Sequence, residues 1–238
     1  MKRTVLIIGA SSDIGLEIAK QRAAKGDQLI LHYHSNKTRI NELADEIAID
    51  QVLQIIQADL SRTEGIEQLL ANLVFHVDII IFSSGKTEFG LFQEMSHESM
   101  DSMLKLHIEA PWRITQQLLP SMIKNSFGNI IFITSIWGDI GASYEVLYST
   151  VKGAQNSFIK ALAKEVAPSN ITVNGISPGF IDTKMNASLS QDEKKEIFQE
   201  IPLKRPGYPR EVAEAVDFIL NHPFMNGQIL PITGGWMI

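Results

Sequence analysis

The sequence predicts an α/β fold in which helices cover both faces of a seven-stranded parallel sheet. Three observations indicate it. Seven short apolar runs recur along the chain, longer segments with helical periodicity separate them, and 238 residues suit one large domain. The runs are rich in Ile, Val and Leu and nearly continuous, which is typical of parallel strands buried on both faces.

The order of the elements is strand, helix, strand throughout, which predicts a Rossmann-type doubly wound sheet with right-handed crossovers. The expected strands are 4–9, 28–33, 51–57, 78–84, 128–135, 170–177 and 227–233. The expected helices are 13–25, 36–49, 62–74, 97–124, 147–167 and 210–221. No long linker or internal repeat divides the chain, so we expect a single domain over 1–238.

One segment, 182–208, fits neither pattern well. It is polar, contains Pro202 and Pro206, and is long for a connection. Segments of this kind often cover a site, so we expect a substrate lid here.

Composition excludes several classes of protein. The net charge of −6 argues against an extended nucleic-acid surface, and the absence of cysteine excludes disulfides, thiolate zinc sites and cysteine nucleophiles. The apolar run before Gly9 is too short for a signal peptide, and no apolar stretch approaches the roughly 20 residues of a membrane helix. We expect a cytoplasmic protein without a membrane or nucleic-acid partner. His32 and His34 lack further ligands nearby, so we expect no metal site.

The first turn, "IIGASSDIGLEIA", is a candidate phosphate site. Glycine at the end of a strand permits a tight turn, after which backbone N–H groups and a helix N-terminus can hold phosphate. A simple strand-to-helix turn is the alternative. Asp13 brings a negative charge near the expected phosphates, and we expect it to face away and cap the helix. The candidate residues are Gly9, Ser11, Ser12, Asp13, Ile14 and Gly15.

Tyr148 and Lys152 stand four residues apart in "VLYSTVKG", so they share one face of a helix. Ser135 precedes them at the end of an apolar run. A tyrosine with a pKa of about 10 exchanges protons slowly at neutral pH, and an adjacent ammonium should draw that pKa downward. A tyrosine–lysine pair alone often lies on a solvated face, so the interpretation depends on the whole set of motifs.

The whole set resembles the short-chain dehydrogenase/reductase family. The opening turn, Ser135, the tyrosine–lysine pair and "SPGFIDT" (177–183) occur in the family's order and spacing over essentially the full chain. The family turn T-G-x-x-x-G-x-G has Ile8 in place of its Thr and Asp13 in place of its central Gly. The resemblance implies hydride transfer between a nicotinamide cofactor and a ketone. Tyr148 would then be the acid, Ser135 would stabilise the carbonyl oxygen and Lys152 would bind the nicotinamide ribose.

The resemblance also implies further cofactor contacts. Asp59 would meet the adenine, although it could instead cap the following helix. The family's N-N-A-G is "FSSG" here, so the backbone can still approach the cofactor but the Asn side chains are gone. The additional candidates are Asp59, Leu60, Ser83, Ser84, Gly85, Pro178, Gly179, Ile181 and Thr183.

His107 stands in "SMLKLHIEAPW" where the family has a catalytic Asn. The Asn orients a water in the proton relay, and a histidine could bind that water or pass a proton itself. Equally, His107 could only pack the helix while the relay runs from Lys152 through other water. Both readings stay open.

The end of the second strand favours NADPH over NADH. A cofactor with a bare 2′-hydroxyl is usually held by an acid there, but "LHYHSNK" contains none before Glu42. We expect Lys37 to bind the 2′-phosphate, with Ser12 assisting. The other candidates are Tyr33, His34 and Asn36.

Within the family the chain most resembles 3-oxoacyl-carrier-protein reductases, which dock an acidic carrier on basic residues. Ser126 and Ser169 occupy the corresponding positions. The loop 138–147 instead carries Asp139 and Glu145, with Glu109 expected nearby. An acidic rim would disfavour an acidic carrier and suit a cationic substrate. A solvated surface loop is the alternative.

The stretches "LHIEAPW", "SIWGDIGASYEVLYS" and "KGAQNSF" resemble a narrower group, the elongation factor P 5-aminopentanone reductases. This implies reduction of a ketone on a modified lysine of elongation factor P. The alternatives are 3-oxoacyl-carrier-protein reduction and a non-catalytic NADPH-binding protein. Related enzymes also imply a homo-oligomer, either a dimer or a tetramer, through the helices at 97–124 and 147–167.

Overall fold

The computed structural model describes residues 2–48, 50–187 and 189–236. Its seven strands form one sheet in the order β3-β2-β1-β4-β5-β6-β7, and every neighbouring pair is parallel. The predicted fold class and strands are therefore confirmed. The strands are β1 (Thr4–Ile8), β2 (Gln28–Tyr33), β3 (Val52–Gln57), β4 (Ile79–Phe82), β5 (Gly128–Ile133), β6 (Ile171–Pro178) and β7 (Ile229–Ile232).

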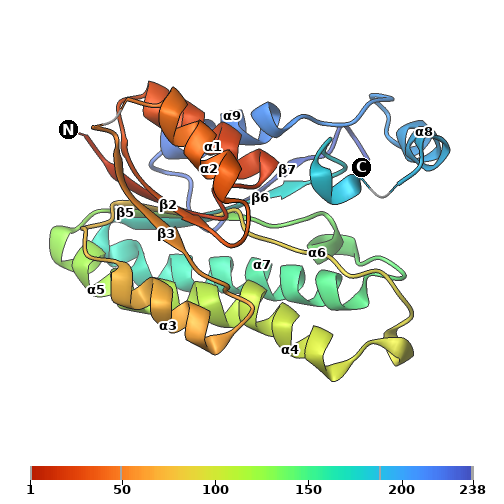
Figure 1. The fold of residues 1–238 in the computed structure, drawn as a ribbon, viewed down its shortest axis with the longest axis horizontal. Helices are drawn as coiled ribbons and strands as arrows, with labels where there is room; N and C mark the ends of the chain where they lie inside the picture. Colours follow the sequence, from red (N-terminus) through yellow and green to blue (C-terminus); the bar gives the residue numbers. More distant parts are fainter. Residues whose placement is uncertain (1, 49, 188, 237–238) are drawn as a thin grey trace.

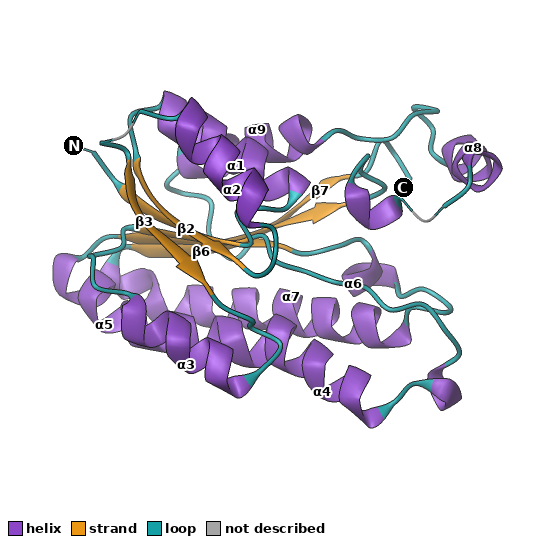
Figure 2. Ribbon diagram, in the orientation of Figure 1, coloured by secondary structure: helices purple, strands orange, loops and turns teal. Residues whose placement is uncertain are grey.

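Helices lie on both faces of the sheet (Figures 1 and 2). One face carries α1 (Asp13–Ala24), α2 (Lys37–Glu46) and α9 (Pro209–Leu220). The other carries α3 (Thr63–Asn72), α4 (His97–Leu104), α5 (Ala110–Asn125) and α7 (Val146–Val166). Alternate residues of each strand point to opposite faces and so belong to two different apolar cores. Ile7 packs on the face covered by α1, α2 and α9, and Leu6 packs on the face covered by α3, α5 and α7.

The helix predicted at 97–124 contains a break that the sequence pattern did not indicate. A π-helical turn, Lys105–Glu109, joins α4 to α5 and carries His107. Pro111 has no N–H to donate to the carbonyl four residues earlier, which is that of His107. The side chain of Gln155 on α7 donates to that carbonyl instead, with 2.8 Å between Nε2 and O. The break therefore fixes His107 against the helix that holds Tyr148.

The segment 182–208 is partly helical. It contains a short turn, Lys184–Asn186, and α8 (Gln191–Glu200), which Ser190 and Glu193 begin with reciprocal capping hydrogen bonds. Figure 1 shows α8 beyond the carboxyl ends of the strands. Among the described residues, no helix is both long and apolar enough to cross a membrane.

The sheet topology fixes where a ligand can lie. The chain starts in the middle of the sheet with β1, which pairs with β2 on one side and β4 on the other. Successive crossovers run in opposite directions from this point. In doubly wound sheets the crevice at such a switch point, outside the carboxyl ends of the strands, binds ligands.

Candidate active site

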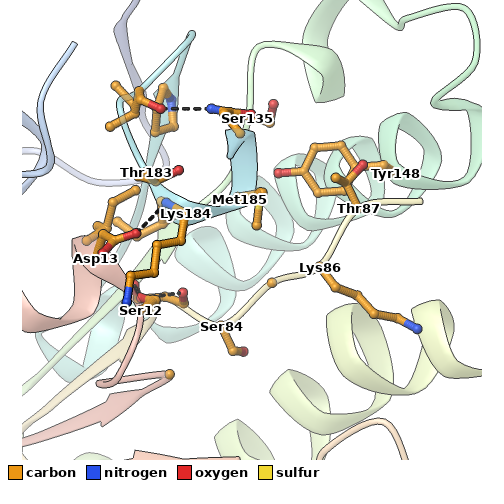
Figure 3. A pocket seen from close by; sticks show the side chains of 18 of the residues that line it. Ser12, Asp13, Ser84, Lys86, Thr87, Ser135, Tyr148, Thr183, Lys184 and Met185 are labelled. Atoms are coloured by element: carbon orange, nitrogen blue, oxygen red, sulfur yellow. Dashed lines mark hydrogen bonds between the residues drawn. The ribbon is translucent and has the colours of Figure 1, made fainter. Parts of the chain in front are cut away.

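A cavity of about 900 Å³ opens at this switch point (Figure 3). The loops after β1, β2, β3, β4, β5 and β6 form its walls, together with the start of α7, residues 183–186, Leu189 and Ile197. The predicted site residues at its wall are Gly9, Ser11, Ser12, Asp13, Ile14, His34, Asp59, Leu60, Ser83, Ser84, Gly85, Ser135, Tyr148, Lys152, Pro178, Gly179, Ile181 and Thr183.

The phosphate turn is built for close backbone approach. Gly9 has a φ of +83°, and a Cβ on it would lie 2.6 Å from Cα of Ser84. Any other residue would therefore push the turn away from the loop after β4. Gly15 lies behind the wall, where a Cβ would meet the Gly9 carbonyl at 2.3 Å. The first helical turn can thus pack directly under the site.

His32 supports this turn, a role that its position at a strand end did not reveal. Its Nδ1 accepts the N–H of Gly9 at 3.1 Å, and its Nε2 donates to the carbonyl of Ala58 at 3.0 Å. Burial lowers the pKa of His32 to about 4, so the ring stays neutral and keeps this pair of roles. His32 thereby links the turn after β1 to the end of β3.

Asp13 lines the cavity and does not cap α1, so the prediction that it faces away and caps the helix is wrong. The cap is Ser12, whose Oγ accepts the N–H of Gly15 at 3.0 Å. Asp13 Oδ1 instead lies 2.6 Å from Nη2 of Arg39, and Oδ2 accepts the N–H of Lys184 at 2.7 Å (Figure 3). A serine can reach the helix N-terminus with its short side chain, which leaves the aspartate free to join the turn to the backbone of Lys184.

The cation that lines the cavity near the end of β2 is Arg39, and not Lys37 as predicted. Arg39 lines the cavity, and its Nη1 donates to the carbonyl of Ser11 at 3.0 Å. Lys37 does not reach the wall, and Asn36 caps α2 by accepting the N–H of Arg39. Tyr33 also lies outside the wall and bonds through its hydroxyl to Gln57. The cation that sequence reasoning missed lies one half-turn further along α2.

Ser135, Tyr148 and Lys152 come together as predicted. Ser135 lies two residues beyond the end of β5, while the other two project from α7 into the same cavity. Lys152 Nζ donates to the carbonyl of Ile133 at 2.8 Å and lies 5.5 Å from the centre of the Tyr148 ring. In Figure 3 the hydroxyl of Tyr148 points towards the part of the cavity bounded by Ser135 and Met185.

The pKa of Tyr148 is raised and not lowered, contrary to our expectation. Burial raises it most, the Glu145 carboxylate adds to the rise, and a hydrogen bond with Ser135 opposes it. Burial also lowers the pKa of Lys152 to about 7 from an ordinary value of 10.5. A lysine with so low a pKa carries a reduced charge at neutral pH, so its expected pull on Tyr148 is weak in this structure.

His107 lies behind the catalytic residues and does not line the cavity. Its ring packs edge-on against Tyr148 with 5.9 Å between centroids, and its Nε2 is 3.1 Å from the carbonyl of Lys86. Burial and the nearby Lys152 keep its pKa well below the ordinary value, so the ring is neutral. Donation from Nε2 to Lys86 leaves Nδ1 as a buried acceptor without a protein partner among the described residues.

The expected acidic rim is reduced to one residue. Asp139 does not line the cavity; its carboxylate accepts hydrogen bonds from Asn156 at 2.8 Å and Ser177 at 3.0 Å. Glu109 pairs with Arg113 one turn along its helix. Of the three acids expected in the rim, only Glu145 reaches the cavity wall, where it is 9% exposed and accepts a hydrogen bond from the Thr87 hydroxyl at 2.6 Å.

The residues present fit a nicotinamide dinucleotide. The glycine turn leaves no room for a Cβ at Gly9, and "SSG" (83–85), Pro178 and Gly179 also line the cavity. Such a cofactor, when bound, would supply a hydride. The chain itself supplies a protonated hydroxyl at Tyr148, a second hydroxyl at Ser135 and a buried amine at Lys152.

Known proteins share this sequence and fold. The sequence model of the family described as short chain dehydrogenase matches residues 3–194. An uncharacterized oxidoreductase, YmfI, of Bacillus subtilis is 44% identical, with 99% of each chain covered. The 3-oxoacyl-[acyl-carrier-protein] reductase FabG of Aquifex aeolicus is 35% identical over 97% of this chain and 95% of its own.

A solved structure agrees with these relatives. It is described as a putative NAD(P) dependent gluconate 5-dehydrogenase from Beutenbergia cavernae with bound NADP at low occupancy. It superposes with a TM-score of 0.91 at 27% identity, covering 98% of this chain and 96% of its own. Family match, relatives and site geometry lead to one conclusion: the chain is an oxidoreductase that belongs to the short-chain dehydrogenase family.

Proposed function

We propose that the enzyme reduces a ketone to a secondary alcohol with NADPH. The observation that carries this proposal is the position of the Tyr148 hydroxyl beside Ser135 in the cavity, with its pKa raised by burial. A phenol that keeps its proton at neutral pH can donate it to the carbonyl oxygen of the substrate as negative charge develops on that oxygen.

The bond changes follow from these positions. Hydride delivery to the carbonyl carbon forms a C–H bond, and the carbonyl oxygen takes the proton of Tyr148. Ser135 donates a hydrogen bond to the same oxygen as its charge grows. Lys152, which is buried against Ile133 and the tyrosine ring, holds the phenol in place and binds the nicotinamide ribose.

Arg39 supports the preference for NADPH. Its guanidinium lies at the cavity wall near the end of β2, where the 2′-phosphate of NADPH would be bound. The carboxylate of Asp13 holds the guanidinium in position. The other predicted helper at this wall is His34, whose Nε2 lies 3.7 Å from Oδ2 of Asp59.

Arg39→Ala should weaken NADPH binding by about tenfold or more because a charge-assisted contact to phosphate is lost. NADH has no 2′-phosphate, so its affinity should change much less. Dissociation constants for both cofactors, measured by fluorescence titration, test this expectation. Lys37→Ala is the matched control, since it removes a cation from the same helix away from the cavity wall. Equal losses of NADPH and NADH in Arg39→Ala would remove Arg39 from the 2′-phosphate site.

Our best candidate for the substrate is the 5-aminopentanone group on a lysine of elongation factor P. The resemblance of the three sequence stretches supports it, and so does the buried carboxylate of Glu145 at the cavity wall. The 35% identity to FabG favours the alternative, reduction of a 3-oxoacyl group on acyl-carrier protein. A non-catalytic NADPH-binding protein is the third candidate, based on "FSSG" and His107.

The test follows NADPH oxidation with two substrates in parallel: a short 3-oxoacyl thioester and elongation factor P carrying the amino-ketone. Mass spectrometry should show a gain of about two mass units, from one hydride and one proton, on the modified lysine. Turnover of the thioester alone would assign the enzyme to 3-oxoacyl reduction. Binding of NADPH without turnover of either would support the non-catalytic candidate.

The proposal includes a cytoplasmic homo-oligomer, dimer or tetramer, formed through α4, α5 and α7. Leu104 and Trp112 support it, because both are about half exposed on this layer of helices, at 51% and 50%. Sedimentation velocity of the purified protein should show a particle larger than one chain; a monomer at micromolar concentration would contradict this part.

A further inference from the structure

The cavity contains a carboxylate that no cation of the described protein balances. Glu145 is 9% exposed, yet it forms no salt bridge with a described lysine, arginine or histidine. Burial raises its pKa, and the hydrogen bonds that oppose the rise come from the neutral side chains of Thr87 and Trp137. Burying an ionisable group without a partner costs stability, so such residues are usually kept for a function.

The walls around Glu145 are aromatic. The rings of Trp137 and Trp236 meet edge to face with 5.2 Å between centroids, and both line the cavity, as does Phe89. Aromatic faces attract alkylammonium groups through their quadrupole, and the attraction is strongest for tryptophan in a desolvated site. A carboxylate beside tryptophan rings is the arrangement by which proteins bind such cations.

Three lysines line the cavity wall: Lys86, Lys152 and Lys184. The first two are engaged elsewhere. Lys86 Nζ lies 3.0 Å from Glu88 and 2.6 Å from Ser102, and Figure 3 shows its side chain running away from Tyr148. Lys152 Nζ donates to the carbonyl of Ile133. None of the three amines lies within ion-pair distance of Glu145 in the described part of the chain.

We propose that Glu145, together with Trp137 and Trp236, forms a subsite for an alkylammonium group, so that the enzyme selects ketones carrying a positive charge. This proposal rests on the proposed function, because it places the cation beside the tyrosine that protonates the ketone. It concerns the chemical class of the substrate, and any cationic ketone that fits the cavity satisfies it.

The subsite also acts on the catalytic tyrosine. The Glu145 charge contributes to the raised pKa of Tyr148, which makes the phenol a weaker acid. A bound ammonium offsets that charge and restores part of the acidity at the moment of catalysis. The preference for a cation should therefore appear in kcat as well as in KM.

The test uses two ketones of equal shape: one ends in a trimethylammonium group and the other in a tert-butyl group. With NADPH, the wild-type enzyme should favour the cationic ketone by about tenfold or more in kcat/KM. Glu145→Gln keeps an oxygen for the Thr87 hydroxyl and should reduce this preference to less than about threefold. Turnover of the tert-butyl ketone should rise in this variant, because the Glu145 charge no longer raises the pKa of Tyr148.

Glu98→Gln is the matched control, since it removes one negative charge from the exposed start of α4. It should retain the full preference for the cation. A preference that is absent in the wild type, or that survives unchanged in Glu145→Gln, would overturn the subsite and leave Glu145 as a structural tie to Thr87.

Calorimetric binding of both ketones to the NADP-loaded protein separates this proposal from the proposed function. Tighter binding of the cationic ketone that depends on Glu145, without reduction of either ketone, supports the subsite and refutes the reductase. Equal binding and equal reduction of the two ketones supports the reductase and refutes the subsite.

Discussion

Tyr148→Phe should lower kcat for ketone reduction by about a thousandfold while NADPH binds with nearly unchanged affinity. The substitution removes only the hydroxyl that gives its proton to the carbonyl oxygen. The phenylalanine ring keeps the packing against His107, whose centroid lies 5.9 Å away. Steady-state rates and a fluorescence titration with NADPH measure the two quantities on the same preparation.

Ser149→Ala is a useful control, because this hydroxyl lies on the same helix and its Oγ bonds the N–H of Ala142 outside the cavity wall. It should retain most of the activity. Residual turnover of Tyr148→Phe within about tenfold of wild type would contradict the role of Tyr148 as the acid.

Lys152→Met should abolish most of the activity. Its effect on the free energy of unfolding should change sign with pH, from neutral or stabilising near pH 7 to destabilising near pH 10. In the folded chain burial lowers the pKa of Lys152 to about 7, whereas its ordinary value is 10.5. Between these two pH values the unfolded chain binds more protons at this residue than the folded chain. The free energy of unfolding of the wild type therefore rises with pH through this window, and below it the buried lysine imposes its full cost.

The size of the effect follows from two opposing contributions. Each unit of pKa difference corresponds to about 1.4 kcal/mol, so removing the amine should relieve a few kcal/mol at neutral pH and below. The variant also leaves the carbonyl of Ile133 without the donor that lies 2.8 Å away, which costs about 1–3 kcal/mol. We expect the apo variant to be at least as stable as wild type near neutral pH and less stable near pH 10.

Urea unfolding of both apo proteins across this range measures the difference directly. A difference that stays constant with pH would mean that Lys152 titrates normally in the folded chain. Retention of more than about a tenth of the wild-type kcat by Lys152→Met would contradict its catalytic role.

Much of the fold could be read from the sequence because each strand is a short aliphatic run and each helix has its own periodicity. Ile79–Phe82 at the centre of the sheet is wholly apolar, and its neighbours β1 and β5 are mainly Ile, Val, Leu and Phe. The catalytic residues could be found because their chemistry depends on residue type and local spacing. Tyr148 and Lys152 are neighbours on one helix wherever that helix lies.

Contacts between distant segments could not be read in this way. Lys37 and Arg39 are two cations on one short helix, and only the packing of α2 against the first turn shows that the second reaches the cavity. His32 shows a similar limit: its partners Gly9 and Ala58 belong to different loops. Asp139 resembles a surface acid until β6 and α7 bring Ser177 and Asn156 to its carboxylate.

The break between α4 and α5 has a consequence for how this sequence can change. Pro111 removes a backbone donor, and the side chain of Gln155 on another helix replaces it. The effect of substituting either residue on stability therefore depends on which residue stands at the other position. While residue 111 is proline, loss of Gln155 leaves the buried carbonyl of His107 without a hydrogen-bond donor. A residue with an N–H at position 111 could donate to that carbonyl, and loss of Gln155 would then leave no group unpaired. Substitutions at the two positions should therefore be epistatic, and the order in which they arise decides whether His107 keeps its place beside the catalytic tyrosine.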